Sequence, residues 1–163
     1  MNNKGHCRGA LAFSIIPTSL SLDHGFIFAF LSFMSCLSAA SFPDWAEKLM
    51  KLPHRSLFHT LSIWVGLSMY SYSNLGDGPL WCVLFGFSCG GVSHWVGDVP
   101  NKQGLPIFTP KDRFALHLWE SGKHQNLTVL VIFALSLSVA AMNKTLFNQV
   151  YSYIDRLNLI NCI

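Results

Sequence analysis

Histidines and carboxylates stand beside the apolar segments of this chain at spacings that suit a metal site. His94 and Asp98 are four residues apart in HWVGD. On a helix such a pair shares one face, so both can bind one ion, or the aspartate can orient the histidine. His54 and His59 are five residues apart in HRSLFH. That spacing is about 140° of helical rotation, so they converge only if His54 precedes the helix that His59 opens.

These pairs extend to a larger set of residues with the same chemistry. The metal-capable residues on the same side of the predicted membrane are His6, Asp44, His54, His59, His94, Asp98, His117, Glu120 and His124. Zinc takes imidazole and carboxylate ligands, and a catalytic zinc site keeps one position open for water. We therefore predict a divalent metal, with zinc as its identity. Arg55 and Asp98 are the candidate catalytic residues, and Arg55 can stabilise negative charge on a reacting group.

The elements that position these residues are predicted to be apolar helices. Hydrophobic residues make up 51% of the 163 residues and charged residues 12%, whereas a soluble domain carries about 25% charged residues. Backbone groups in lipid must be satisfied within each segment, so we expect an all-α polytopic membrane protein with about four to five transmembrane helices. The predicted helices of this single domain, 1–163, are 9–22, 25–42, 57–75, 79–98 and 127–143.

These runs differ in how well they fit a bilayer. A spanning helix needs about 20 apolar residues. The three middle runs meet that length, the last can be extended by its flanks, and the first is short and broken by Pro17. Residues 99–126 form a long inner loop, within which we expect a short interfacial helix over 111–124. Residues 144–163 are predicted to be a C-terminal interfacial segment.

The positive charges indicate how the helices are oriented. Nine of the eleven lysines and arginines fall on one side if all five runs span, which places that side and the N-terminus in the cytoplasm. Six of the seven histidines fall on the same side, and His24 is the exception. A lone interfacial histidine is often a capping or snorkelling residue, the simpler role for His24, His117 and His124 taken singly. The convergence of the others favours a site at the cytoplasmic face.

The same residues resemble a known family of bacterial inner-membrane proteins classed as metal-dependent hydrolases and described as LexA-binding or LexA-regulated. The family pattern has an N-terminal histidine, a Pro-Asp segment, an HRGxTHS-like box, an HxxxD pair and a Gly/Pro-rich turn. The matching residues here are His6, Pro43-Asp44, His54-Arg55, His59-Thr60, His94, Asp98, Gly104, Pro106 and Pro110. The resemblance thereby narrows the candidate metal ligands to His6, Asp44, His54, His59, His94 and Asp98.

Two departures from the family pattern stand out. The box here reads HRSLFHT, and Ala46 stands where a second acidic residue is usual. The resemblance implies a hydrolase at the inner membrane that acts with metal-activated water on a phosphoester or a lipid-like substrate. It leaves the substrate and the number of ions open.

Two other classes of function compete with a hydrolase. A non-enzymatic membrane component, either a metal or proton transporter or a small partner subunit, would also place histidines at a membrane. A transporter carries polar groups through the midplane, but the middles of the second and fifth runs offer only small groups such as serine and cysteine. The net charge of +3 and the lack of a basic recognition helix argue against nucleic acid as a partner. Membrane lipid is the expected partner.

Overall fold

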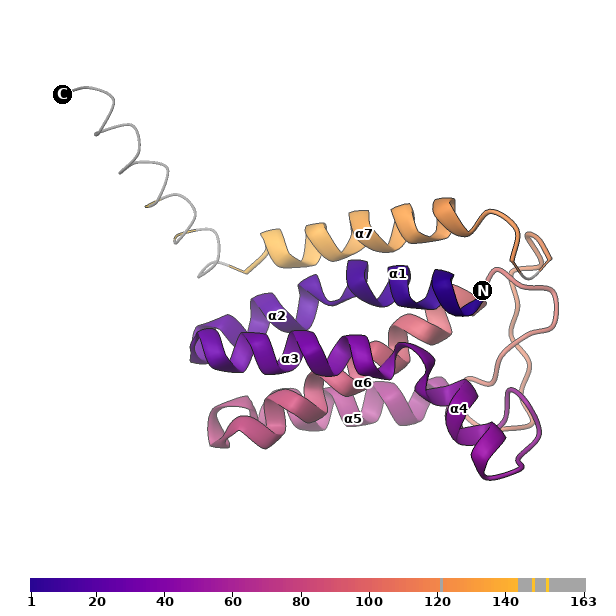
Figure 1. Ribbon diagram of the computed structural model, residues 1–163, viewed down its shortest axis with the longest axis horizontal. Coiled ribbons are helices and arrows are strands. Elements are labelled where there is room, and N and C mark those ends of the chain that lie inside the picture. The colour runs from indigo at the N-terminus through magenta and orange to yellow at the C-terminus, as the bar shows by residue number, and fades with distance from the viewer. Residues whose placement is uncertain (121, 144–147, 149–151, 153–163) are drawn as a thin grey trace, which may run out of the picture.

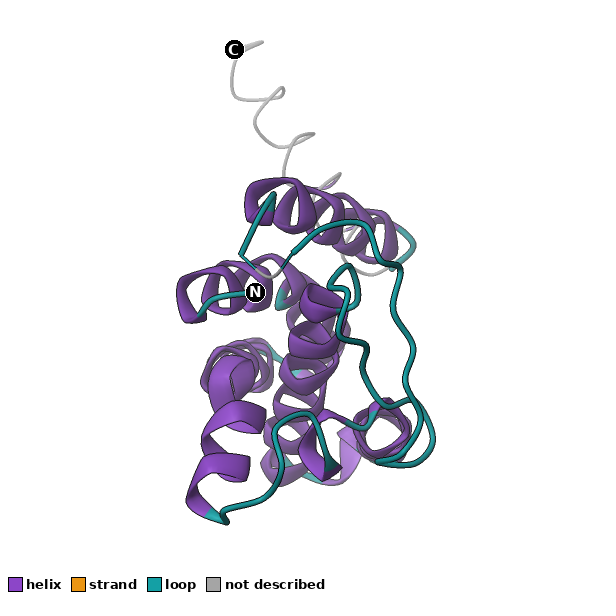
Figure 2. Ribbon diagram, turned by 90° about the vertical axis from the view of Figure 1, so that its right-hand side faces the viewer, coloured by secondary structure: helices purple, strands orange, loops and turns teal. Residues whose placement is uncertain are grey.

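The computed structural model describes residues 1–120 and 122–143, together with 148 and 152. In this part of the chain the regular structure is helical, and the strand-like pairing is limited to two isolated bridges. The helices run between two ends of an elongated bundle, with the long loop and the N-terminus at the same end (Figures 1 and 2). The longer helices are α1 (Asn3–Phe13), α2 (Ile15–Ser21), α3 (Phe26–Ser38), α4 (Phe42–Leu49), α5 (Leu61–Ser73), α6 (Pro79–Asp98) and α7 (Gln125–Ala141).

The helix boundaries differ from the predicted ones at the end that carries the candidate site. The first helix begins at Asn3 because the Asn2 side chain accepts a hydrogen bond from the backbone N–H of Gly5 at 2.9 Å, and His6 therefore lies on the helix. Helical structure continues past residue 42 to Leu49, so Asp44 lies in the first turn of α4. Residues 57–59 form a short 3-10 turn, η3, and α5 begins only at Leu61.

The long loop contains turns and bridges where we expected an interfacial helix. Asn101 pairs with Trp119 and Leu105 with Phe114, so the loop folds back on itself. The backbone N–H groups of Leu116 and Leu118 donate to the carbonyls of Val99 and Pro100, both at 3.1 Å, so these groups do not form the hydrogen bonds of a helix over 111–124. The predicted C-terminal segment, 144–163, lies outside the described residues apart from 148 and 152.

Close contact between α3 and α6 depends on two glycines one helical turn apart. A Cβ atom built on Gly86 would stand 2.1 Å from the carbonyl oxygen of Ser32, and one on Gly90 would stand 2.4 Å from that of Cys36. Small residues at this spacing let two helices approach closely in a membrane. The hydroxyl of Ser32 uses this closeness to donate to the carbonyl of Cys82 at 2.9 Å.

We expect Gly86→Ala to destabilise the bundle by about 1–3 kcal/mol, because the added methyl group meets α3 backbone that cannot move aside. Thermal unfolding in detergent measures the effect. Gly66→Ala on α5 is the matched control, since no atom of the described part of the chain lies within 4 Å of its Cβ position, and a helix gains up to about 1 kcal/mol from this change. Equal melting temperatures for the two variants would contradict the close packing of α3 on α6.

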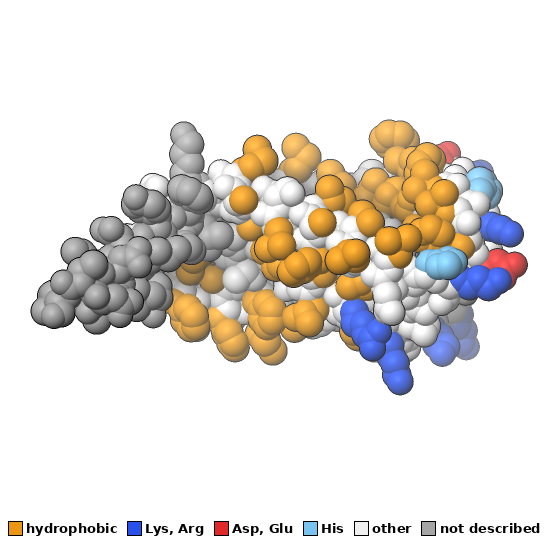
Figure 3. All heavy atoms as spheres, turned by 90° about the horizontal axis from the view of Figure 1, so that it is seen from above, with side chains coloured by type: hydrophobic (Ala, Val, Ile, Leu, Met, Phe, Trp, Pro, Cys, Tyr) orange, Lys and Arg blue, Asp and Glu red, His pale blue; other side chains and the backbone are white. Residues whose placement is uncertain are grey.

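The surface of the bundle is apolar and its interior is rich in small polar groups. Large hydrophobic side chains are exposed along α3, α5 and α7, including Phe26, Met69 and Leu130, and Figure 3 shows them spread over the body of the molecule. The stretches Phe26–Leu49 and Pro79–Asp98 are long and apolar enough to cross a membrane. Charged and histidine side chains gather at the end where α1 begins (Figure 3). This arrangement is typical of a helical membrane protein.

Candidate metal centre

All six predicted ligands meet at the charged end of the bundle; His54 stands in the loop before η3, and the other five come from four separate segments. His6 is on α1, Asp44 on α4, His59 on η3, and His94 and Asp98 on the last turns of α6. Of these five, all except Asp44 are buried, with exposed fractions of 4% or less. Asp44 is about one-third exposed at its side chain.

Asp44, His59 and His94 form a triangle of the size that zinc requires. The His59 Nε2 atom lies 3.2 Å from Asp44 Oδ1 and 3.2 Å from His94 Nε2, and His94 Nε2 lies 3.7 Å from Asp44 Oδ1. A tetrahedral zinc ion bound at about 2.0–2.1 Å holds its ligand atoms roughly 3.3–3.4 Å apart. The three atoms therefore match three corners of a zinc tetrahedron and leave the fourth corner to a further ligand.

Neighbouring groups fix the orientation of both imidazoles. His94 Nδ1 lies 2.7 Å from the carbonyl oxygen of Ala40, which can only accept, so Nδ1 carries the proton and Nε2 offers its lone pair to the centre. His59 Nδ1 lies 3.0 Å from Glu47 Oε1. Such partners behind metal-bound histidines raise their basicity and hold the rings in place.

A second group, made by His6 and Asp98, adjoins this triangle. His6 Nε2 lies 3.4 Å from Asp98 Oδ1, and the His6 ring stacks on the His94 ring at 3.8 Å between centroids. His6, His94 and Asp98 offer ligand atoms within 4.8 Å of one another. Asp98 also contacts the amino group of Met1 and accepts a hydrogen bond from Asn101 Nδ2 at 3.0 Å. The end of α6 is therefore built to hold a carboxylate in its charged form.

Arg55 is buried beside Asp98 and keeps spare hydrogen-bond donors. Its Nη2 atom lies 3.2 Å from Asp98 Oδ2, whereas its Nε and Nη1 atoms are buried and have no hydrogen-bond acceptor among the described residues. The backbone there is left-handed, with φ of 62°. A non-glycine residue in this region carries strain of the kind that gathers at functional sites.

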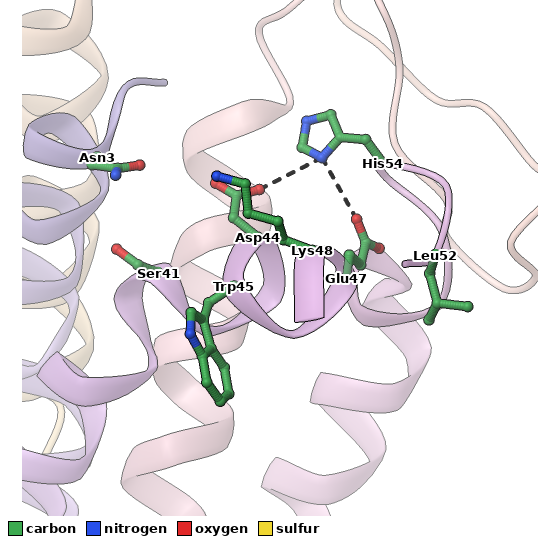
Figure 4. Close-up of a pocket in the computed structure, with 8 residues that line it drawn as sticks. All are labelled: Asn3, Ser41, Asp44, Trp45, Glu47, Lys48, Leu52 and His54. Atoms are coloured by element: carbon green, nitrogen blue, oxygen red, sulfur yellow. Dashed lines mark ion pairs between the residues drawn. The ribbon is translucent and has the colours of Figure 1, made fainter. Parts of the chain in front are cut away.

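His54 is the most exposed member of the centre, and its ligand atom lies within 4.8 Å of those of Asp44 and His59. Its side chain is 61% exposed, with Nδ1 3.8 Å from Asp44 Oδ1 and 3.6 Å from Glu47 Oε2, as Figure 4 shows. His54 stands in the loop and its ring centroid is 5.2 Å from that of His59. The two histidines thus converge from either side of the η3 turn, and His54 borders the opening.

Unsatisfied polar atoms test whether these residues suit a metal. Buried groups normally have hydrogen-bond partners, yet Asp44 Oδ1 and both ring nitrogens of His6 are buried without a well-formed hydrogen bond to any described residue. Ligand-type atoms such as these would cost several kcal/mol if nothing satisfied them. A divalent cation compensates such a set, so the residues fit the predicted ion.

Glu47 belongs to the site but was absent from the predicted ligands. It is 1% exposed, and its oxygens accept from the backbone N–H groups of Arg55 and Ser56, both at 2.8 Å. Its spacing of three residues from Asp44 in PDWAE places both carboxylates on one face of α4. That spacing was the available signal, and Glu47 stands next to Ala46, where the family pattern has its second acid.

Proton competition at His59 should make metal binding depend on pH. Burial opposes a charge on the His59 ring, but the carboxylates of Asp44 and Glu47 outweigh it and raise the pKa of His59 above its ordinary value. A proton on the ring excludes a metal ion, so zinc affinity should fall as pH drops from about 8 to about 6. Zinc titrations across this range measure it. An affinity that does not change with pH would contradict His59 as a ligand.

Comparisons with known proteins agree with this arrangement at the level of family. Searches of curated proteins and of solved structures find no significant match. A family model described as YdjM inner membrane protein matches residues 1–154, which include the whole of the centre. The match covers far more than half of the chain and fits a bundle with an apolar surface and a charged end. The chain therefore belongs to the YdjM inner membrane protein family.

Proposed function

We propose that this protein is a multi-pass membrane hydrolase, with its N-terminus in the cytoplasm, that uses a divalent metal ion to cleave an ester or phosphoester bond. The observation that carries the proposal is the triangle of Asp44, His59 and His94, which matches zinc in size and leaves the fourth corner to a further ligand. When bound, the ion supplies a water whose pKa is lowered to about 7 and an electrophile for developing charge.

The chain's own residues have distinct tasks in this proposal. Ala40 and Glu47 hold the two imidazoles with their lone pairs toward the ion. Arg55 uses its Nε and Nη1 donors to bind negative charge that develops on the reacting group, and Asp98 holds the guanidinium through Nη2. The strained backbone at Arg55 is anchored by Glu47, so one carboxylate positions both a ligand and the charge-binding residue.

The interior of the bundle favours a hydrolase over a transporter. A transport path needs polar or ionisable groups through the midplane. The buried polar side chains between α3 and α6 are serines, and Ser32 and Ser35 donate to backbone carbonyls of the facing helix. The histidines and carboxylates of the centre lie instead together at one end, where a substrate can reach them from the membrane surface.

Hydrolysis assays on purified protein in detergent test the proposal. Zinc-loaded protein should hydrolyse p-nitrophenyl phosphate or p-nitrophenyl butyrate, and removal of zinc with a chelator should abolish the reaction. Arg55→Lys should lower kcat and leave zinc content unchanged, because lysine lacks the forked donors of arginine. Zinc-loaded protein that hydrolyses neither compound, or equal rates with and without zinc, would refute the proposed function.

A further inference from the structure

A pocket of about 570 Å³ opens beside the metal centre, along α4. Asp44 and Glu47 of the centre line it, together with His54 at its edge. Figure 4 shows that the remaining wall includes the side chains of Trp45, Lys48 and Leu52. A pocket of this volume accommodates a small molecule or a lipid headgroup. Through Asp44, the ligand triangle borders the pocket directly.

On the side of α4 that forms this wall, a row of charged side chains lies next to a row of exposed apolar side chains. Asp44 and Lys48 are four residues apart on α4 and share a face. Trp45 and Leu49 form the adjacent row and are 59% and 65% exposed, followed by Met50 at 57%. Exposed tryptophan and aliphatic groups beside a lysine are typical of a helix that lies in the membrane interface. A ligand that contacts both rows has a charged part and an apolar part.

The charges of the centre favour an anion in this pocket once the metal is bound. The carboxylates of Asp44, Glu47 and Asp98 carry three negative charges. The guanidinium of Arg55 and a divalent ion together carry three positive charges, so they neutralise these carboxylates. Lys48 then leaves a positive charge on the pocket wall. Without the ion, the same carboxylates would repel a phosphate.

We propose that this pocket binds the phosphate headgroup of an anionic membrane phospholipid, with Lys48 paired to the phosphate and Trp45 beside the glycerol and the start of the acyl chains. This narrows the substrate of the proposed hydrolase to a lipid-borne phosphate that reaches the centre from the bilayer. It rests on the proposed function, because the bound ion offsets the carboxylates. A lysine near a membrane surface attracts an anionic lipid by about 1 kcal/mol, or about fivefold in affinity.

Calorimetric titration of the full chain in a non-ionic detergent tests the proposal without relying on turnover. The probes are dihexanoyl phosphatidic acid, dihexanoyl phosphatidylcholine and glycerol 3-phosphate, each added to zinc-loaded and to chelator-treated protein. We expect phosphatidic acid to bind most tightly and only with zinc present. Lys48→Gln should weaken its binding about fivefold. Lys51→Gln is the matched control, since Lys51 is exposed at the same end but does not line the pocket.

Other outcomes overturn the proposal in identifiable ways. Equal binding of phosphatidylcholine, or equal losses from Lys48→Gln and Lys51→Gln, would refute a specific anion site at Lys48. Glycerol 3-phosphate that binds as tightly as phosphatidic acid would make the ligand a free phosphate ester and not a lipid. Zinc content, measured first on the same samples, separates the two proposals: protein that takes no zinc refutes the proposed function, whereas zinc-loaded protein without lipid preference refutes only this inference.

Discussion

Replacement of His94 by alanine is expected to lower the affinity for zinc about 100-fold. Four-ligand zinc sites bind with about 10–16 kcal/mol, so one ligand contributes roughly 3 kcal/mol. His94 is 2% exposed, its Nε2 atom faces both Asp44 and His59, and its Nδ1 atom is held by Ala40. Competition titration of purified protein against a chromophoric zinc chelator measures the change.

Two further variants separate a lost ligand from a lost fold. His94→Gln keeps a polar side chain that can donate to the Ala40 carbonyl, and it should also lose zinc affinity while the protein stays folded. His24→Ala is the matched control, because His24 is an exposed histidine at the opposite end of the bundle. Zinc affinity unchanged in His94→Ala, or lowered equally in His24→Ala, would rule out the triangle as the binding site.

Replacement of Glu47 by alanine is expected to weaken zinc binding 10- to 100-fold and to destabilise the loop before α5. The expected loss of zinc affinity is the loss that usually follows removal of the group that orients a metal-bound histidine. The structural effect arises because the backbone N–H groups of Arg55 and Ser56 would lose their acceptor. A buried donor left without a partner costs about 1–3 kcal/mol.

Zinc titration and limited proteolysis together measure both effects of Glu47→Ala. Cleavage in residues 50–60 should become faster, since this segment depends on the Glu47 carboxylate. Glu120→Ala is the control: Glu120 is 61% exposed at its side chain and pairs with the nearby Lys123, away from the centre. If Glu47→Ala and Glu120→Ala behave alike in both measurements, Glu47 does not organise the centre.

The sequence predicted the helices well where a long apolar run decided them. The helix 79–98 was placed at the bounds of α6, because twenty apolar residues in lipid have no alternative to helix. The pairing of His94 with Asp98 followed from that helix alone. The start of α1 was misplaced by six residues, because Asn2 caps a polar first turn that lacks an apolar signal.

The parts of the site that the sequence did not predict depend on tertiary contacts. In the sequence, Glu47 cannot be distinguished from an exposed acidic residue at a membrane interface. In the structure, the turn at Arg55 packs over Glu47 and leaves it 1% exposed. His54 was predicted as an equal ligand, and it offers a ligand atom within 4.8 Å of those of Asp44 and His59, although the loop leaves its side chain 61% exposed at the pocket edge. The stacking of His6 on His94 joins residues far apart in the chain, and no local pattern encodes their distance.

X-ray absorption at the zinc edge, on protein loaded with one equivalent of zinc, tests the central claim most directly. A tetrahedral centre built on Asp44, His59 and His94 predicts nitrogen and oxygen neighbours at about 2.0–2.1 Å with the outer scattering of imidazole rings. His94→Ala should reduce the imidazole signal. A sulfur neighbour at about 2.3 Å, as from the exposed Cys7, or a shell of water oxygens without imidazole, would contradict the account.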